Sequence, residues 1–255
     1  MIKFFRHIRF KLMSENKTGK YFKYAIGEIV LVVIGILIAL QINNWNEARQ
    51  IRQSEIKYLK NIKLDLKKDL VTLKKQINIR KNKLKITESL ISHIDGTKPI
   101  SDLDLLSRNI FATINEERFT PNNSTYMELA NSGNLSLIES DSIKSLLLEL
   151  EELYKNNKFG IEHEAFEYKE YINKSLFKYV DIDKLKTVYY KNIPAESQGL
   201  KFEDFNDLLK SLEYKNGLTI SNTLSEIFIQ SYKEIQNKST KVLEIIEEEV
   251  ETTDD

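Results

Sequence analysis

Three histidines, and the glutamates around one of them, are the residues of this chain whose types could bind a metal. His163 lies in "IEHEAFE" (161–167), whereas His7 and His93 have no such neighbours. Zinc proteases need an H-E-x-x-H spacing and di-iron bundles need E-x-x-H pairs, and neither spacing occurs in the sequence. The chain also has no cysteine. We therefore expect no metal and no cofactor, and we interpret His163 as part of a solvated helix face.

Catalytic motifs are also missing from the sequence. There is no glycine-rich phosphate loop and no G-x-S-x-G nucleophile elbow. The alternative of an enzyme that uses two carboxylates in a cleft between helices stays open, because one sequence does not show which acids are buried. We expect no catalytic residues and a protein that is not an enzyme.

One polar loop could carry recognition. In "TPNNSTY" (120–126), Asn122, Asn123 and Tyr126 could contact a partner or ligand, because loop tips often carry function. The alternative is structural, since Asn and Ser side chains commonly satisfy the backbone of a turn.

A long apolar run near the N-terminus predicts a membrane anchor. Residues 25–42 carry one charge over 18 positions, which is just long enough to span about 30 Å of hydrocarbon. Aromatic residues flank the run at the depth of the membrane interfaces: Tyr21, Phe22 and Tyr24 on one side and Trp45 on the other. A cleaved signal peptide is disfavoured because no A-x-A site follows the run. A buried soluble helix is disfavoured because the run is apolar on every face.

Glu28 lies inside the predicted span. Acids in a membrane are costly and usually paired, so Glu28 could contact a partner subunit. The alternative is that it reaches the headgroups or neutralises a nearby lysine. Gly35 and Ala39, four residues apart, would allow two such helices to approach closely.

Charge is distributed unevenly along a chain whose net charge is zero. Residues 1–24 carry seven Lys/Arg and one acid, and the last nine residues carry six acids and no base. The basic segment should stay in the cytoplasm, which would place residues 46–255 in the periplasm of an inner-membrane protein. Residues 2–13 form a basic amphipathic pattern, which we interpret as a helix on the anionic inner leaflet rather than as a nucleic-acid site.

Two stretches resemble a known family. They are "TGKYFKYAIGEIVLVVIGILIALQINNWNE" (18–47), after a "MIKFFRHIRF" start, and "FTPNNSTYMELANSGNLSLI" (119–138). Both are similar to a family of uncharacterised single-pass membrane proteins from Bacteroidota, a domain of unknown function with the anchor motif GEIVLVVIGILIALQINNWNE. The resemblance implies a membrane anchor and implies no activity.

Past the anchor, apolar residues recur every seven positions. With position a at residue 56 and position d at residue 59, nine of the twelve a and d sites up to residue 94 are Ile or Leu. This predicts a long helix over 43–95, continuous with the span. The seam would pack either on the same chain or on a second copy in a coiled coil, and the sequence leaves both open, although Arg80 disfavours a tight symmetric dimer.

The rest of the chain predicts an elongated helical bundle over 96–250 and an acidic tail at 251–255. We expect helices over about 102–117 (capped by Ser101), 125–130 (a capping box from Thr125 to Glu128), 141–180 (capped by Ser140), 203–213 and 223–250 (a capping box from Thr223 to Glu226), with an irregular connection over 181–203 and a turn at 216–217. Helix 141–180 should run back along the stalk, and the last helix should run away again. The fold class is therefore all-α.

These features predict a non-enzymatic, membrane-anchored envelope protein. Its helical bundle would bind protein partners, or form a homo-oligomer through the stalk and the span. The alternative is a periplasmic ligand-sensing bundle that signals through an associated membrane protein.

Overall fold

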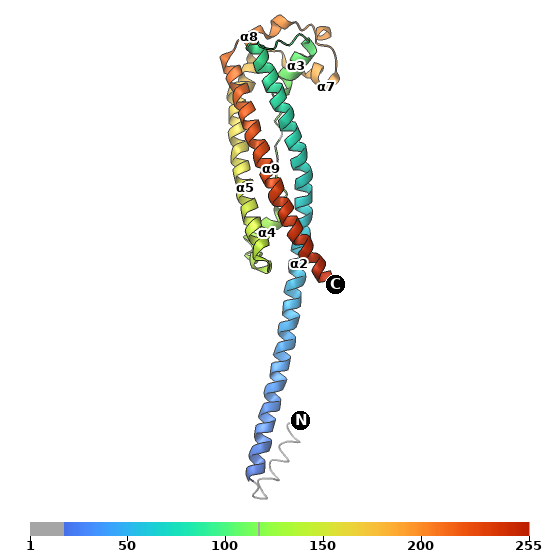
Figure 1. Ribbon diagram of the computed structural model, residues 1–255, viewed down its shortest axis with the longest axis vertical. Helices are drawn as coiled ribbons and strands as arrows, with labels where there is room; N and C mark the ends of the chain where they lie inside the picture. The colour runs from blue at the N-terminus through green and yellow to red at the C-terminus, as the bar shows by residue number, and fades with distance from the viewer. Residues whose placement is uncertain (1–17, 117, 255) are drawn as a thin grey trace. The chain divides into compact units, whose positions relative to one another are not determined.

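The computed structural model describes residues 18–116 and 118–254, and in this part of the chain every regular element is helical (Figure 1). The predicted all-α fold class is confirmed. The chain divides into two compact units, Met1–Lys57 and Tyr58–Asp255, which are described separately below. The predicted amphipathic helix over 2–13 lies outside the described residues.

The first unit consists of the N-terminal part of helix α2, whose bounds are Thr18–Ile94. An 18-residue window of this helix has a mean hydropathy of 2.6, and none of it is buried. Large apolar side chains are exposed on all its faces, as Ile29 (63% exposed) and Leu37 (59%) illustrate. By length and composition this stretch is a candidate membrane span.

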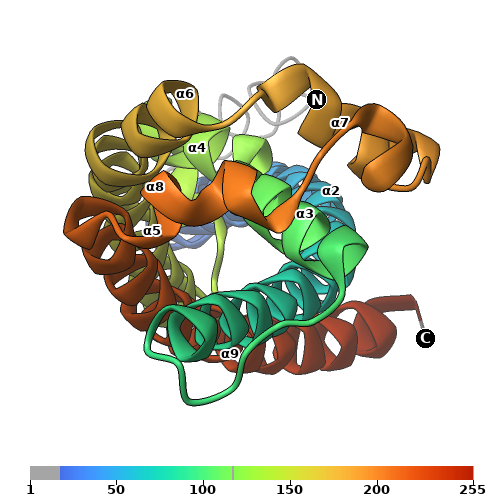
Figure 2. The ribbon, with the colours of Figure 1, turned by 90° about the horizontal axis from the view of Figure 1, so that it is seen from above.

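Three long helical stretches form the second unit. They are the C-terminal part of α2, then α5 (Asp141–Glu167) continued by the π-helix η2 (Tyr168–Asn173) and by α6 (Lys174–Tyr179), and finally α9 (Leu212–Asp254) (Figures 1 and 2). Helix α5 runs parallel to α2, and α9 runs antiparallel to both. Side-chain contacts fix these directions: Tyr154 with Asp69 and Glu164 with Arg80 for α5, and Asn222 with Thr87 and Glu247 with Lys63 for α9. The predicted order of reversals was therefore wrong, because α9 is the returning helix.

The return that sequence analysis assigned to 141–180 is made by an extended segment, which we call the return segment (residues 115–123, of which 117 is not described). Lys83 contacts Asn115, and Asp69 contacts Asn122. From Lys83 to Asp69 the helix covers about 21 Å at roughly 1.5 Å per residue. From Asn115 to Asn122 an extended chain covers about 23 Å at roughly 3.3 Å per residue. A short extended segment can thus cover the same distance as a helical stretch of twice as many residues.

Short helices complete the second unit. Helix α3 packs on α7, and both lie with α8 at the end of the bundle where α2 terminates (Figure 2). In the sequence, helix α4 and the 3-10 helix η1 come after the return segment and before α5. Their bounds are α3 Leu103–Ala112, α4 Ser124–Asn131, η1 Asn134–Leu137, α7 Ile182–Lys191, η3 Glu196–Gln198, η4 Phe202–Phe205 and α8 Asn206–Leu209.

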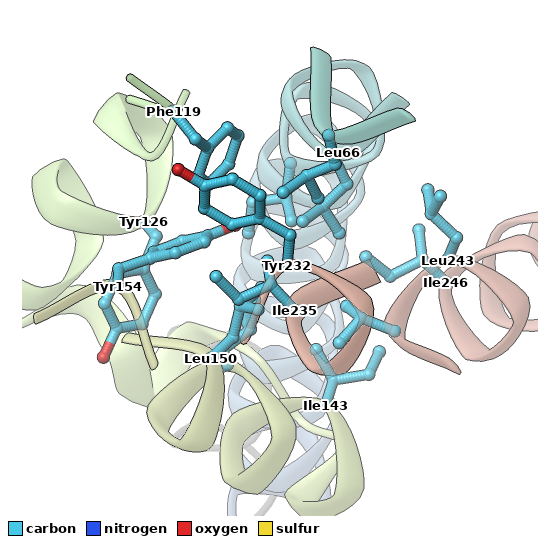
Figure 3. Close-up of a cluster of buried hydrophobic side chains, with 14 of the residues drawn as sticks. Leu66, Phe119, Tyr126, Ile143, Leu150, Tyr154, Tyr232, Ile235, Leu243 and Ile246 are labelled. Carbon is cyan, nitrogen blue, oxygen red and sulfur yellow. The ribbon is translucent and has the colours of Figure 1, made fainter. Parts of the chain in front are cut away.

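Two hydrophobic clusters hold this unit together. The larger one joins α2, the return segment, α4, α5 and α9, and Figure 3 shows Phe119, Tyr126 and Tyr154 converging with Tyr232 on Leu66. Phe119 and Tyr232 meet nearly edge to face at 5.8 Å between ring centroids. The second cluster lies under α3, α7 and α8 and includes Leu106, Val188 and Tyr214.

The buried stripe of α2 differs from the predicted seam. The d positions from Leu59 to Thr87 are buried as expected, but the second buried row lies at the g positions, one residue before a. The helix therefore packs on its own chain in this unit, which was one of the two alternatives. Four of the six buried g positions are polar, namely Glu55, Asp69, Gln76 and Lys83, and the other two are Ile62 and Leu90.

Several predicted element boundaries were wrong for identifiable reasons. Residues 182–191, expected to be irregular, form α7, which Asp181 caps by accepting hydrogen bonds from the Asp183 and Lys184 amides. Helix α9 begins at Leu212 and passes through the predicted turn at 216–217. Gly217 is needed there for packing, because a Cβ atom would lie 2.9 Å from Tyr171 Cβ.

Helix caps agree with the sequence at one site and differ at three. Ser140 caps α5 through the Ile143 amide, as predicted. Helix α3 is capped by Asp102 instead of Ser101 and ends at Ala112, before the predicted boundary. The Thr125 hydroxyl donates to Asp65 instead of forming a capping box, and Thr223 lies inside α9.

Candidate functional site

Three buried polar residues of α2, spaced seven apart, hold the return segment; we call Asp69, Gln76 and Lys83 the polar ladder. Gln76 Nε2 donates to the Arg118 carbonyl (3.4 Å), and Lys83 Nζ donates to the Asn115 carbonyl (2.9 Å). An extended segment packed between helices has no neighbouring strand to satisfy its backbone, so side chains must do so. The seven-residue spacing keeps these side chains on one face of α2.

Asp69 is the most connected member of the polar ladder and is fully buried. It accepts hydrogen bonds from the Asn122 amide (2.9 Å), from Asn122 Nδ2 (2.7 Å) and from the Tyr154 hydroxyl (3.1 Å). Burial raises the pKa of Asp69, and these donors oppose that shift. Burial, together with the Asp69 carboxylate, also raises the pKa of Tyr154. The cluster joins α2, the return segment and α5 at one point.

The three residues predicted for recognition lie around this cluster. Asn122 is held by Asp69, Asn123 Nδ2 donates to Glu151 (3.0 Å), and Tyr126 is only 8% exposed. A cavity of about 20 Å³, enough for a single water molecule, lies beside them. Asn122 and Tyr126 therefore stabilise the packing of the return segment and α4. Asn123 also lines an open groove.

This groove lies between the return segment and α5 and has a volume of about 440 Å³. Phe119 and Tyr154 back the groove but are only 1% and 7% exposed, and its accessible side chains include both cations and carboxylates. Such a mixture suits a small ligand that carries both charges. The lining residues are Arg118, Phe119, Thr120, Pro121, Asn123, Glu151, Tyr154, Lys155, Lys158, Ile161 and Glu162.

Further along α2, Arg80 forms a buried ion pair with Glu164 of α5. The guanidinium contacts both carboxylate oxygens, with Nη2 to Oε2 at 2.7 Å, and Arg80 is 1% exposed. The Phe228 ring lies 4.3 Å from the guanidinium carbon. Burial opposes the charge of Arg80, but the Glu164 carboxylate outweighs it and raises the pKa of Arg80. This pair fixes α5 against α2.

In the first unit, the residues predicted for membrane contact lie on α2. Glu28 is partly exposed, and Gly35 and Ala39 are exposed, with no atom within 4 Å of a Cβ built at Gly35. Exposed aromatic residues stand at both ends of the apolar run: Phe22 at 65%, Tyr24 at 51% and Trp45 at 63%. The side chain of Tyr21 lies outside the described residues.

The histidines in the described part of the chain have surface or structural positions. His93 Nδ1 accepts a hydrogen bond from the Ile100 amide (2.8 Å), which fixes the turn after α2. His163 is exposed, and its Nε2 lies 3.8 Å from Glu167. Within residues 18–116 and 118–254, no group of three metal-ligating side chains comes together.

Sequence reasoning missed the polar ladder and the Glu164 partner of Arg80. A signal existed for the ladder, because residues 69, 76 and 83 are polar at intervals of seven beside an apolar stripe. The partner of Arg80 had no local signal, since it lies 84 positions away.

Comparison with known proteins places this chain in one family. The profile of a family described as a family of unknown function (DUF6090) matches residues 28–210, which include most of the candidate span, the polar ladder and the return segment. Searches of curated proteins and of solved structures gave no significant match. Because the match covers well over half of its length, the chain belongs to this family of unknown function.

Proposed function

We propose that this protein is a non-enzymatic, single-pass protein of the inner membrane whose second unit binds other proteins in the periplasm. The observation that carries the proposal is the fully exposed apolar stretch of α2. Side chains such as Ile29, Leu37 and Ile38 each lose roughly 1.5–3 kcal/mol of burial energy if they stay in water. Lipid is the medium that stabilises a helix of this kind.

The charge pattern supports the orientation. Seven Lys/Arg residues precede the span within residues 1–24, which favours a cytoplasmic N-terminus in contact with anionic lipid. The absence of cysteine allows a direct test in the full chain. Thr97→Cys should react with a membrane-impermeant maleimide in intact cells whose outer membrane is permeabilised, and Ser14→Cys should react only after lysis. Labelling of Ser14→Cys in intact cells, or recovery of the protein in the soluble fraction, would refute the proposal.

Protein binding is supported by large apolar side chains on the surface of the second unit. Phe159, Phe166 and Phe177 are 59–71% exposed, although unpaired aromatic residues are costly on a soluble surface. Crosslinking in native membranes, followed by affinity purification of the full chain, should recover species larger than the monomer. Recovery of the monomer alone at several crosslinker lengths would count against protein binding.

The groove beside Asn123 favours a second candidate, a ligand-sensing domain that signals through an associated membrane protein. Its cations and carboxylates suit amino acids or short peptides, which carry both charges. Such ligands should raise the unfolding temperature of the full chain in detergent, and Lys158→Glu should abolish the shift without changing the unfolding temperature of the ligand-free protein. An unchanged temperature over a panel of these ligands would remove this candidate.

A further inference from the structure

The exposed side of α2 in the second unit carries charge of one sign; we call its twelve exposed positions between residues 60 and 85 the basic face. Seven of these positions are lysines and none is an acid. The two aspartates of this stretch lie outside the face, since Asp69 is buried and Asp65 accepts a hydrogen bond from Thr125. The lysines of the basic face are Lys60, Lys67, Lys68, Lys74, Lys75, Lys81 and Lys85.

The heptad pattern of α2 arranges these lysines in rows. Because positions d and g are buried, positions b, e and f of the same heptads lie on the opposite side of the helix. Position e is lysine in four consecutive heptads, at residues 60, 67, 74 and 81. These lysines recur about every 10.5 Å along the axis, and Lys85 extends the face to about 38 Å, at roughly 1.5 Å per residue. The basic face is therefore a long, narrow surface on a single helix.

Carboxylates of the same chain neutralise only part of this charge. Lys67 pairs with Glu247 at the edge of the face (3.1 Å). Within residues 18–116 and 118–254, four of the seven lysines make no ion pair, and they are Lys68, Lys74, Lys81 and Lys85. The exposed side of α9, by contrast, carries both signs, as Lys241 and Glu244 illustrate. Like charges along one helix repel each other, and an anionic partner relieves that repulsion.

The composition of the basic face disfavours a protein or a nucleic acid as this partner. Protein interfaces have cores rich in aromatic residues and poor in lysine, whereas the large apolar side chains among these twelve positions are Leu64 and Val71 alone. Nucleic-acid sites use arginine forks on phosphates and aromatic rings on bases, and these positions hold neither residue type. The remaining three are Asn61, Asn78 and Asn82. Their amides both donate and accept hydrogen bonds, which suits the hydroxyl groups of sugars.

We propose that the basic face binds a linear acidic polysaccharide, whose carboxylates contact the lysines and whose hydroxyl groups contact the asparagines. An extended polymer can follow the lysine rows along the helix, whereas a flat membrane would reach all seven lysines only if α2 lay along it. Binding releases counterions from the polymer, so it should weaken as the salt concentration rises. The inference goes beyond the proposed function, because this partner is a glycan and not a protein.

Charge removal tests the face directly. The full chain is placed in nanodiscs of zwitterionic lipid, and fluorescence anisotropy measures its binding to labelled alginate, a linear polyuronate, and to uncharged dextran. The natural chain should bind alginate and not dextran. Replacing four lysines should weaken alginate binding by roughly tenfold or more at about 50 mM salt, and should also reduce its salt dependence. The four changes are Lys68→Gln, Lys74→Gln, Lys81→Gln and Lys85→Gln, and unchanged helicity by circular dichroism shows that the variant folds.

A matched variant separates the arrangement of the lysines from the net charge of the chain. It replaces four exposed lysines of other helices, through Lys169→Gln, Lys186→Gln, Lys233→Gln and Lys241→Gln. This variant loses the same charge and should weaken alginate binding by less than about threefold. Equal weakening by the two variants would overturn the inference, and so would a natural chain that does not bind alginate.

Two further comparisons identify the class of polymer. Asn61→Ala combined with Asn78→Ala and Asn82→Ala should weaken the binding of alginate and leave unchanged the binding of poly-L-glutamate, which has no hydroxyl groups. Equal effects on the two polymers would overturn the assignment to a polysaccharide. Displacement of alginate by phosphatidylglycerol vesicles at equal anion concentration would overturn it in favour of a membrane surface. Membrane insertion and the capture of other proteins are measured separately, so such a failure is distinct from failure of the proposed function.

Discussion

Removal of Glu164 tests whether the buried ion pair determines the stability of the second unit. Glu164→Ala leaves the Arg80 guanidinium, 1% exposed, without the carboxylate that contacts it through two nitrogens. Breaking one side of a buried pair costs about 3–5 kcal/mol. For a slope of about 2–3 kcal/mol per molar urea, the unfolding midpoint should fall by roughly 1–2.5 M. Far-UV circular dichroism of the full chain in detergent measures this change.

Two matched variants separate the buried charge from lost packing. Arg80→Met with Glu164→Leu removes both charges and keeps comparable volume, so it should recover most of the stability. Glu152→Ala removes a carboxylate whose partner, Lys155, is 60% exposed, and it should cost less than about 1 kcal/mol. The reasoning is refuted if Glu164→Ala costs no more than Glu152→Ala, or if the double variant is as unstable as the single one.

Three further predictions concern packing, the polar ladder and pH. Gly217→Ala should destabilise the unit by about 1–3 kcal/mol, because its methyl group would lie 2.9 Å from Tyr171 Cβ, which is fixed to the backbone. Gly160→Ala meets only the edge of the Phe228 ring and should be close to neutral, and thermal melts compare the two variants. Asp69→Ala strips acceptors from the Asn122 amide and should cost about 1–3 kcal/mol by urea unfolding, and amide exchange at Asn122 should accelerate. Lys63 and Lys67 lower the pKa of Glu247 in the folded protein. The stabilisation from these ion pairs is therefore present above the unfolded pKa near 4.5 and is lost as the pH falls through the lowered folded pKa. Glu247→Gln should reduce the melting temperature at pH 7 and have no effect at pH 2.

The sequence was sufficient for the fold class and for the long helices, because these depend on local periodicity. The apolar run at residues 25–42 and the heptads after it specify α2 directly. Ser140 likewise identifies the start of α5. These signals lie within a few turns of the residues that they position.

The direction of the helices and the contacts between them could not be predicted in this way. A glycine such as Gly217 can indicate either a turn or a helix position where another element packs closely, and the sequence around it does not decide between them. Only the close approach of Tyr171 in the folded protein shows that packing is the reason. Asp69 and Gln76 resemble solvated helix residues until the return segment covers them. A buried polar side chain is defined by its distant partner, and periodicity does not encode that partner.

The antiparallel course of α9 has a consequence for biosynthesis. This helix supplies eight residues of the larger hydrophobic cluster: Phe228, Ile229, Tyr232, Ile235, Val242, Leu243, Ile246 and Val250. Ribosomes make these residues after α2 and α5, so the apolar stripes of those two helices stay uncovered until α9 leaves the ribosome. A chain that stops before α9 would leave the apolar stripes of α2 and α5 exposed, and exposed stripes of this kind favour aggregation.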